Sequence, residues 1–165
     1  MKDKQAQALL RRAYELDGAN DEETKALYRD WAETYDGTMI DGLGYVSPMK
    51  IAALTAELVL DRAARILDVG CGTGLLAAFL IEEGFSQIDG LDYSAEMLDV
   101  AKRKGRIVER FEKDLNQPLE MGEAQFDALV STGTFTHGHV GGDCLGALIE
   151  VLRPGGVLIC TVHQD

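Results

Sequence analysis

From residue 65 onward, short apolar runs alternate with stretches of helical periodicity. Such alternation is typical of βαβ units, in which crossover helices join the parallel strands of one sheet. The strands are predicted at 65–69, 87–91, 106–110, 126–131 and 156–162. The helices are predicted at 73–83, 95–104 and 141–152, each ending at a glycine or before a proline-glycine turn. We therefore expect a doubly wound, mainly parallel, Rossmann-like α/β sheet with strand order 3-2-1-4-5.

The residues before this pattern are predicted to be largely helical. Helices are expected at 3–16 and 21–35, followed by a glycine-rich loop at 36–44 and then a further helix. No internal repeat and no Pro/Ser-rich linker interrupts the chain. We therefore expect an N-terminal helical cap, residues 1–46, that forms one compact unit with a Rossmann-like domain, residues 47–165.

The segment after the first predicted strand carries glycines at alternate positions, Gly70, Gly72 and Gly74. Glycine adopts positive φ easily and lets the backbone approach a ligand without a Cβ between them. The helix that follows offers unpaired N–H groups at its N-terminus. Because open α/β sheets bind ligands at the carboxyl ends of their strands, this loop predicts a binding site there.

The spacing of the glycines and the acidic residues around them indicate the kind of ligand. Dinucleotide-binding folds use GxGxxG/A, whereas this loop reads GxGxG. Asp68, two positions before Gly70, would repel a pyrophosphate but can accept hydrogen bonds from an ammonium group. Asp92, 22 residues after Gly70, stands where a carboxylate binds ribose hydroxyls. A ligand with a ribose and a cationic amine but no phosphate is favoured, which describes S-adenosylmethionine.

Five segments together carry a family resemblance. They are LDVGCGTG (67–74), GLDYS (90–94), KDL (113–115), FDALVSTGTFTHGHV (126–140) and LRPGG (152–156). On these segments the sequence resembles the class I S-adenosylmethionine-dependent methyltransferases, over about residues 28–162. YRDWAETYD (28–36) together with THGHV is similar to the small methyltransferase-like group named after the Williams–Beuren chromosomal region. The resemblance implies S-adenosylmethionine as the cofactor, S-adenosylhomocysteine as its product and methyl transfer as the reaction.

The resemblance also implies a role at the cofactor for each matching residue. Asp68 and the backbone of the glycine loop would hold the methionine end, and Asp92 would bind the ribose hydroxyls. Tyr93 would lie against the adenine, while Asp114 and the Leu115 N–H would form hydrogen bonds with it. The full set of cofactor-binding residues that the resemblance implies is Asp68, Gly70, Cys71, Gly72, Gly74, Asp92, Tyr93, Asp114, Leu115, Ser131, Thr132, Tyr28 and Tyr35.

Several of these assignments have an ordinary structural alternative. Ser131 or Thr132, at the end of the fourth strand, would lie near the methionyl group. Tyr28 and Tyr35 would close over the cofactor, but they share a helical face with Trp31, so core packing explains all three equally well. Each aspartate could instead cap a helix or lie on the surface, and this alternative is strongest for Asp114.

His137 and His139 follow the fourth predicted strand, where the family places residues that face the acceptor. A histidine suits a general base because its pKa lies near neutrality. Transfer from a sulfonium is an in-line displacement on an activated donor, however, so positioning supplies most of the rate and a packed, structural histidine is an equal alternative. No metal site is expected, because two histidines two residues apart have no suitably spaced third ligand.

Composition limits the partners and the setting of the protein. The 165 residues contain 16 Lys and Arg against 28 Asp and Glu, a net charge of −12. Nucleic-acid binding relies on basic residues that neutralise phosphates, and the Asn/Asp-Pro-Pro-aromatic sequence of base-modifying methyltransferases is absent after the fourth strand.

No apolar run is long enough for a membrane span. The three cysteines, odd in number and widely spaced, favour a reduced, cytoplasmic setting. The basic residues at 102–106 are expected to be a solvated helix end that complements the macrodipole.

Two functional hypotheses remain, and they belong to different classes. The first is an enzyme that moves a methyl group from S-adenosylmethionine to an O or N of a small molecule, with a protein as the second choice of acceptor. The second is a non-catalytic S-adenosylmethionine-binding module or assembly partner, because the family's sixth and seventh strands are missing from this sequence. The edge of the fifth strand is then expected to be covered by a homodimer contact, by the N-terminal helices or by residues outside this sequence. A nicotinamide-dependent oxidoreductase is a weaker alternative, because the glycine spacing opposes it.

Overall fold

The computed structural model describes residues 2–15, 21–135 and 140–162. Five strands form a single sheet in which every neighbouring pair is parallel. They are β1 (Ile66–Val69), β2 (Ile88–Asp92), β3 (Arg110–Glu112), β4 (Phe126–Phe135) and β5 (Leu152–Val162). Their order is β3-β2-β1-β4-β5, so the predicted fold class and strand order are confirmed.

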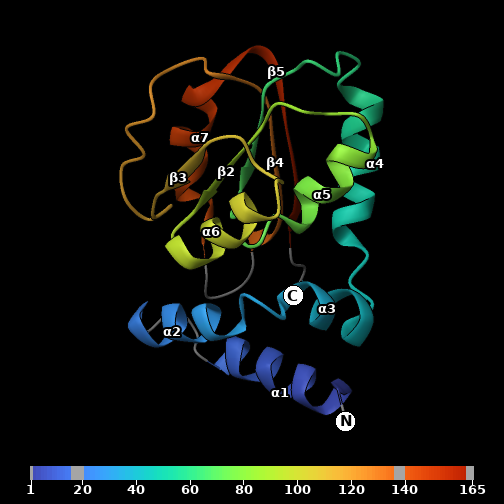
Figure 1. Cartoon of the computed structure of the whole chain (residues 1–165). Helices are drawn as coiled ribbons and strands as arrows, with labels where there is room; N and C mark the ends of the chain where they lie inside the picture. The colour runs from blue at the N-terminus through green and yellow to red at the C-terminus, as the bar shows by residue number, and fades with distance from the viewer. Residues whose placement is uncertain (1, 16–20, 136–139, 163–165) are drawn as a thin grey trace.

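Helices cover both faces of the sheet (Figure 1). One face carries α4 (Ser47–Leu58), α5 (Leu75–Glu82) and α6 (Ala95–Arg103), and the other carries α7 (Leu145–Val151) after a short 3₁₀ turn at Gly142–Cys144. The N-terminal helices lie beyond one end of the sheet and form a further layer (Figure 1). They are α1 (Lys2–Glu15), α2 (Asp21–Trp31) and α3 (Tyr35–Gly37), followed by a π-helical turn at Thr38–Gly42.

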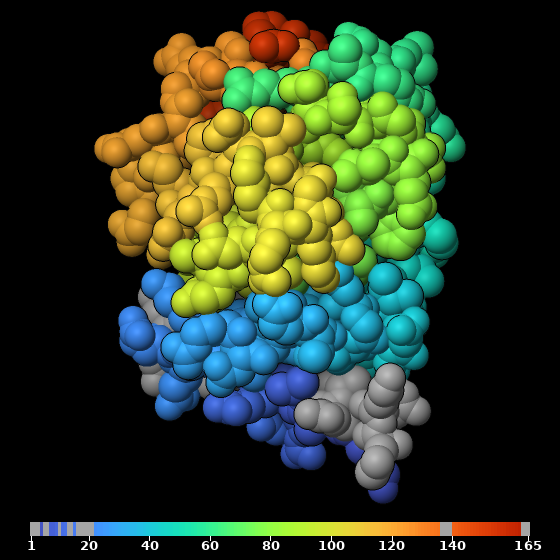
Figure 2. All heavy atoms as spheres, in the orientation of Figure 1, coloured from blue at the N-terminus to red at the C-terminus, as the bar shows by residue number. Residues whose placement is uncertain are grey.

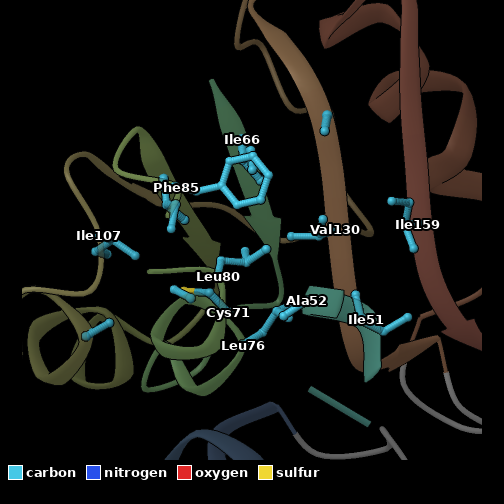
Figure 3. Packing of buried hydrophobic residues seen from close by; sticks show 14 of the residues in the cluster. Ile51, Ala52, Ile66, Cys71, Leu76, Leu80, Phe85, Ile107, Val130 and Ile159 are labelled. Carbon is cyan, nitrogen blue, oxygen red and sulfur yellow. The ribbon is translucent and has the colours of Figure 1, made fainter. Parts of the chain in front are cut away.

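The central strands are buried on both faces, which explains their continuous apolar runs. Side chains alternate across the sheet with a period of two. Ile66 of β1 therefore packs with α4 and α5, whereas Leu67 and Val69 pack with α7. Figure 3 shows Ile66 within the first of these clusters, together with side chains from the neighbouring strands and helices. The sheet that carries the site is thus packed between two hydrophobic clusters, one on each face.

Residues 36–44 are not the loop that their glycines predict. Thr38 N donates to the Thr34 carbonyl at 3.0 Å, and Gly44 N donates to the Ile40 carbonyl at 3.1 Å, so the segment continues as helical turns. Met39 explains the difference, because its buried side chain packs with Trp31 and with neighbouring apolar residues. That tertiary contact outweighs the low helix propensity of glycine.

Several element boundaries also differ from the sequence prediction. The helix expected at 21–35 ends at Trp31, and the one expected at 141–152 begins at Leu145. The strand expected at 106–110 begins at Arg110, because Arg106 N donates to the Ala101 carbonyl at 3.0 Å and closes the end of α6 instead. Strands β4 and β5 are longer than expected, and their pairing is irregular between Ser131 and Phe135. The extension carries β4 beyond the end of β1 and places its last residues beside the glycine loop.

The outer edge of β5 pairs with no strand among the residues that the structure describes. Val162, the last residue of β5, is 67% exposed.

Within the described residues, no helix combines the length and the apolar character that a membrane span requires. Cys71, Cys144 and Cys160 are all free thiols.

Candidate functional site

The glycine loop is held at the carboxyl ends of β1 and β2 by backbone hydrogen bonds. Gly70 N and Cys71 N both donate to the Leu91 carbonyl of β2, at 2.7 and 2.9 Å. Gly70, Gly72 and Gly74 all have positive φ, at 68°, 52° and 77°. Other residues adopt this conformation at a cost of about 1–2 kcal/mol, so the loop requires its glycines on conformational grounds alone.

The surroundings of the three glycines differ in a way that shows where a ligand can approach. A Cβ on Gly70 would lie 2.1 Å from Thr134 Oγ1, and one on Gly74 would lie 3.0 Å from Arg106 Cβ. A Cβ on Gly72 would meet nothing within 4 Å. Gly70 and Gly74 are therefore enclosed by protein, whereas Gly72 borders open space at the carboxyl edge of the sheet.

Asp92 ends β2 and ties the loop to the following helix. Its Oδ2 accepts a hydrogen bond from Gly72 N at 2.8 Å, and its Oδ1 accepts one from Ser94 N at 2.9 Å. Ser94 in turn caps α6, because its hydroxyl accepts from Met97 N at 3.2 Å. Burial raises the pKa of Asp92 and the amide donors oppose that rise. Each carboxylate oxygen can accept a second bond, so Asp92 keeps capacity for a ligand's hydroxyls.

Asp68 is the most unusual polar group of the site. Its side chain is only 1% exposed, and its Oδ2 has no hydrogen-bond partner among the described residues. Burial and, to a smaller extent, the nearby Asp92 raise its pKa to about 8, against the opposite effect of the Ala77 N–H. A buried polar atom without a partner is destabilising unless a ligand satisfies it. An ammonium group fits this position, because it supplies both donors and the compensating charge.

The Cys71 side chain points into the core, and its thiol donates to the Gly72 carbonyl at 3.5 Å. Its side chain is buried in the hydrophobic cluster beneath α5, and its Sγ lies where a Cβ on Gly90 would come within 2.8 Å of it. Burial raises the pKa of the thiol well above its usual value, and Asp68 and Asp92 add to the rise. The thiol is therefore protonated and unreactive at neutral pH.

Aromatic side chains of the N-terminal segment pack together, and Tyr35 among them lies near Asp92. The Trp31 ring stacks on Tyr28 at 6.3 Å and meets Tyr35 edge-on at 4.8 Å between centroids. Burial raises the pKa of Tyr35 well above its usual value, and Tyr28, Tyr45 and Asp92 add to the rise. The phenol of Tyr35 thus stays protonated and can donate a hydrogen bond. Packing on Trp31 is thus shown for both Tyr28 and Tyr35, while their contact with a cofactor stays a prediction.

The residues expected on the adenine side lie at the ends of β2 and β3. Tyr93 is half-buried, with Lys25 Nζ 5.9 Å from the centre of its ring. Asp114 Oδ1 accepts hydrogen bonds from Asn116 N at 2.9 Å and Asn116 Nδ2 at 3.1 Å, which forms an Asx turn. Leu115 is buried against the α7 side of the core. The turn gives Asp114 a structural role that does not depend on a ligand.

The end of β4 carries the remaining expected residues. Ser131 is fully buried and donates to the Val69 carbonyl at 2.7 Å, while Thr132 is half-exposed. His137 and His139 lie outside the described residues. The described part of the chain contains no group of three His, Cys, Asp or Glu residues that could hold a metal ion.

The sequence gives no signal for two further residues at this site, Thr134 and Tyr45. Thr134 Oγ1 donates to the Val69 carbonyl at 3.2 Å and packs beneath Gly70. The Tyr45 hydroxyl lies beside Gly133, where an added Cβ would come within 3.0 Å of it. Both contacts depend on the extension of β4, which the apolar pattern does not reveal.

The expectation that residues 102–106 form a solvated helix end holds for Lys102, Arg103 and Lys104, which are exposed, but not for Arg106, whose side chain is only 18% exposed. Arg103 Nη2 lies 2.7 Å from Glu33, and Lys104 and Arg106 both bind Asp36. Lys102 Nζ donates to the Val108 carbonyl. The sequence does not reveal the pairs with Glu33 and Asp36, because these partners lie 68 or 70 residues earlier in the chain and share no sequence pattern with the basic residues.

Comparison with known proteins agrees with this geometry. A family model described as a methyltransferase domain matches residues 66–156, more than half of the chain. Human methyltransferase-like protein 27 is 36% identical over 140 residues, covering 84% of this chain and 57% of the relative. The malonyl-[acyl-carrier protein] O-methyltransferase of Enterobacter lignolyticus is 35% identical over 109 residues, covering 66% of this chain and 43% of the relative. The chain thus spans about half the length of these curated relatives.

A solved structure supports the fold. A protein of Methanococcus maripaludis, described as a candidate S-adenosyl-L-methionine-dependent methyltransferase, matches with a TM-score of 0.64 at 22% identity, covering 79% of this chain and 62% of that one. A parallel sheet of order 3-2-1-4-5 with a GxGxG loop and two acidic strand ends defines a nucleoside-binding α/β protein. The chain belongs to the class I S-adenosylmethionine-dependent methyltransferases, and the family resemblance is confirmed.

Proposed function

We propose that this chain binds S-adenosylmethionine at the carboxyl edge of the sheet and transfers its methyl group to an O or N of a small molecule. The observation that carries the proposal is the unpartnered, buried oxygen of Asp68 beside the glycine loop. Within a methyltransferase fold, the cofactor's ammonium group is the cation that satisfies this oxygen. The proposal treats residues 1–46 as a cap over the cofactor and residues 47–165 as the domain that binds it.

The proposed contacts divide the cofactor among the strand ends. Asp68 and the loop amides hold the methionine end, and Asp92 binds the ribose hydroxyls. Tyr93, Asp114 and Leu115 flank the adenine. The remaining proposed contacts are those of Ser131, Thr132, Tyr28 and Tyr35. Support comes from the burial of Asp68 and Asp92 and from the open space at Gly72.

The cofactor supplies an electrophilic methyl group on a sulfonium centre. The residues of this chain therefore need only to bind, orient and exclude water, because an in-line displacement gains most from positioning. Ser94 and Asp92 keep the loop and α6 in register, and the tyrosines exclude water from the cofactor. His137 and His139 remain candidates for a general base toward the acceptor.

The acceptor is proposed to be a small molecule. The net charge of −12 opposes nucleic acid. One relative is named as an O-methyltransferase of a malonyl group on a carrier protein, which supports an oxygen acceptor. A cytoplasmic setting remains part of the proposal and agrees with the free thiols.

Incubation with S-adenosylmethionine and a metabolite extract is expected to yield a compound heavier by one methyl group, detected by mass spectrometry. Production of this compound should fall at least tenfold with Asp92→Ala, because loss of an acceptor for two hydroxyls and two amides costs about 1–3 kcal/mol. Asp99→Ala, at an exposed position on α6, is the matched control and should keep full activity. Binding of the cofactor without any methylated product would favour the second hypothesis, a non-catalytic module.

The free edge of β5 leads to a second prediction, which concerns assembly. An exposed row of backbone donors and acceptors favours pairing with another strand, and we propose a homodimer through this edge. Sedimentation at micromolar concentration should then show a dimer, and Val157→Pro should shift it to a monomer. A monomer that exchanges its amides rapidly throughout 157–162 would contradict the prediction.

A further inference from the structure

Asp36 lies at the centre of a cluster that joins the N-terminal cap to the glycine loop. Its Oδ1 accepts a hydrogen bond from Thr73 Oγ1 at 2.5 Å. Its Oδ2 accepts from Lys104 Nζ at 2.8 Å and from Arg106 Nη1 at 2.6 Å. Arg106 Nη1 also donates to the Thr73 carbonyl at 3.0 Å. The hydroxyl and the carbonyl of one loop residue are thus both bound by the same ion pair.

The position of Thr73 gives this cluster its importance. Thr73 stands between Gly72 and Gly74, is fully buried, and belongs to the loop that borders the proposed cofactor site. Asp36 directly follows Tyr35, whose phenol is close enough to Asp92 for that aspartate to raise the pKa of the phenol. The Asp36 carboxylate therefore connects Tyr35 of the cap with the glycine loop at Thr73.

The pair of Asp36 and Arg106 is better protected from solvent than the pair of Glu33 and Arg103, although Lys104 is 33% exposed. The side chains of Asp36 and Arg106 are 16% and 18% exposed, whereas those of Glu33 and Arg103 are 66% and 62% exposed. Exposed pairs contribute little because water screens them, while charge-assisted bonds with less solvent are stronger. Figure 2 shows the cap helix α2 lying directly against α6, the helix that precedes Arg106. The Arg106 stem also packs on Gly74, which fixes the guanidinium beside the loop.

We propose that Asp36 is a positioning residue, which fastens the cap to the glycine loop through Thr73 and Arg106 and so holds Tyr35 over the bound cofactor. This inference rests on the proposed function for the identity of the ligand. The contact of Asp36 with Thr73 and Arg106 is present in the structure whatever the ligand is. Loss of the carboxylate charge would leave the cap free to separate from the loop, and the cofactor would then dissociate faster. Asp36 is not expected to touch the cofactor or the acceptor.

Asp36→Asn in the full chain tests the proposal, with S-adenosylhomocysteine as the probe. The dissociation rate measured by stopped-flow fluorescence should rise roughly tenfold, because a partly buried charge-assisted pair is lost, and added salt should affect the variant less than the wild type. Arg106→Gln should match Asp36→Asn, the double variant should be no worse than either, and Arg106→Lys should keep most of the wild-type behaviour. Glu33→Gln removes the exposed pair and should change the rate less than about twofold.

Hydrogen exchange of the ligand-free proteins separates this inference from the proposed function. Amides at 72–75 and 31–37 should exchange faster in Asp36→Asn, while those of β2 should not change. If wild type binds no S-adenosylhomocysteine but these amides respond, the proposed function fails and the fastening role stands. An unchanged dissociation rate in Asp36→Asn, or unchanged exchange at 72–75, would overturn the inference. A lower melting temperature with neither change would show a merely structural role and would also overturn it.

Discussion

Asparagine in place of Asp68 is expected to weaken the binding of S-adenosylhomocysteine roughly a hundredfold, as loss of a buried charge-assisted contact implies. The same substitution should stabilise the ligand-free protein at pH 8. The two effects have one cause, because the carboxyl group is buried with an oxygen that has no partner among the described residues and that the proposed ligand would satisfy. Titration calorimetry measures the first effect, and urea unfolding measures the second.

The pH dependence of this stability effect has a definite sign. Burial first, and then Asp92, raise the pKa of Asp68 from an ordinary 3.8 to about 8 in the folded protein. Between these values the folded state holds a proton that the unfolded state has released. The stability associated with this proton is fully present below the unfolded pKa and is lost as the pH rises through the folded one. Wild type should therefore lose stability between about pH 4 and pH 8, and Asp68→Asn should lose less.

Binding should show the complementary dependence. An ammonium ligand prefers the ionised carboxylate, so affinity should rise with pH up to about 8 and each binding event at lower pH should release a proton. Asp99→Asn, an exposed position on α6, is the matched control and should alter neither property. Wild-type affinity in Asp68→Asn, or a loss of stability at pH 8, would contradict the assignment of Asp68.

Alanine at Gly70 is expected to reduce the free energy of unfolding by about 3 kcal/mol, the sum of left-handed backbone strain and overpacking. The φ of Gly70 is 68°, and a Cβ would lie 2.1 Å from Thr134 Oγ1. Thr134 cannot turn away freely, because its hydroxyl donates to the Val69 carbonyl. Urea unfolding of Gly70→Ala, Thr134→Ala and the double variant would check this. The double variant should be more stable than the two single effects added together, since Thr134→Ala removes the clashing atoms.

Gly72 provides the matched comparison for Gly70 within the same loop. Its φ of 52° implies similar backbone strain, but nothing lies within 4 Å of an added Cβ. Gly72→Ala should therefore cost only about 1–2 kcal/mol of stability, yet it should impair cofactor binding by occupying the open space. Equal losses of stability at the two positions would show that the loop is not enclosed at Gly70 as described.

The sequence predicts the parts of the site that depend on local pattern. The strand, the glycine turn and the acidic residue at the end of the next strand all follow from apolar periodicity and the conformational freedom of glycine. These features place Asp68 and Asp92 at the same edge of the sheet, and the structure shows Asp92 bound to Gly72 there.

Contacts between distant side chains do not follow from such patterns. The Asp36 cluster joins residues 37 to 70 positions apart, and no periodicity relates them. The buried Met39 likewise makes a glycine-rich segment helical through tertiary packing. The charges of the cap and of α6 were individually visible in the sequence, but their pairing requires the cap to lie against α6.

Calorimetric titration of the wild-type chain with S-adenosylhomocysteine at pH 8 tests the central claim most directly. The site predicts saturable binding of one ligand per chain, with an affinity that falls sharply in Asp68→Asn and changes little in Asp99→Asn. Absence of binding at millimolar ligand, or equal binding by wild type and Asp68→Asn, would contradict the claim that the carboxyl edge of this sheet is a cofactor site.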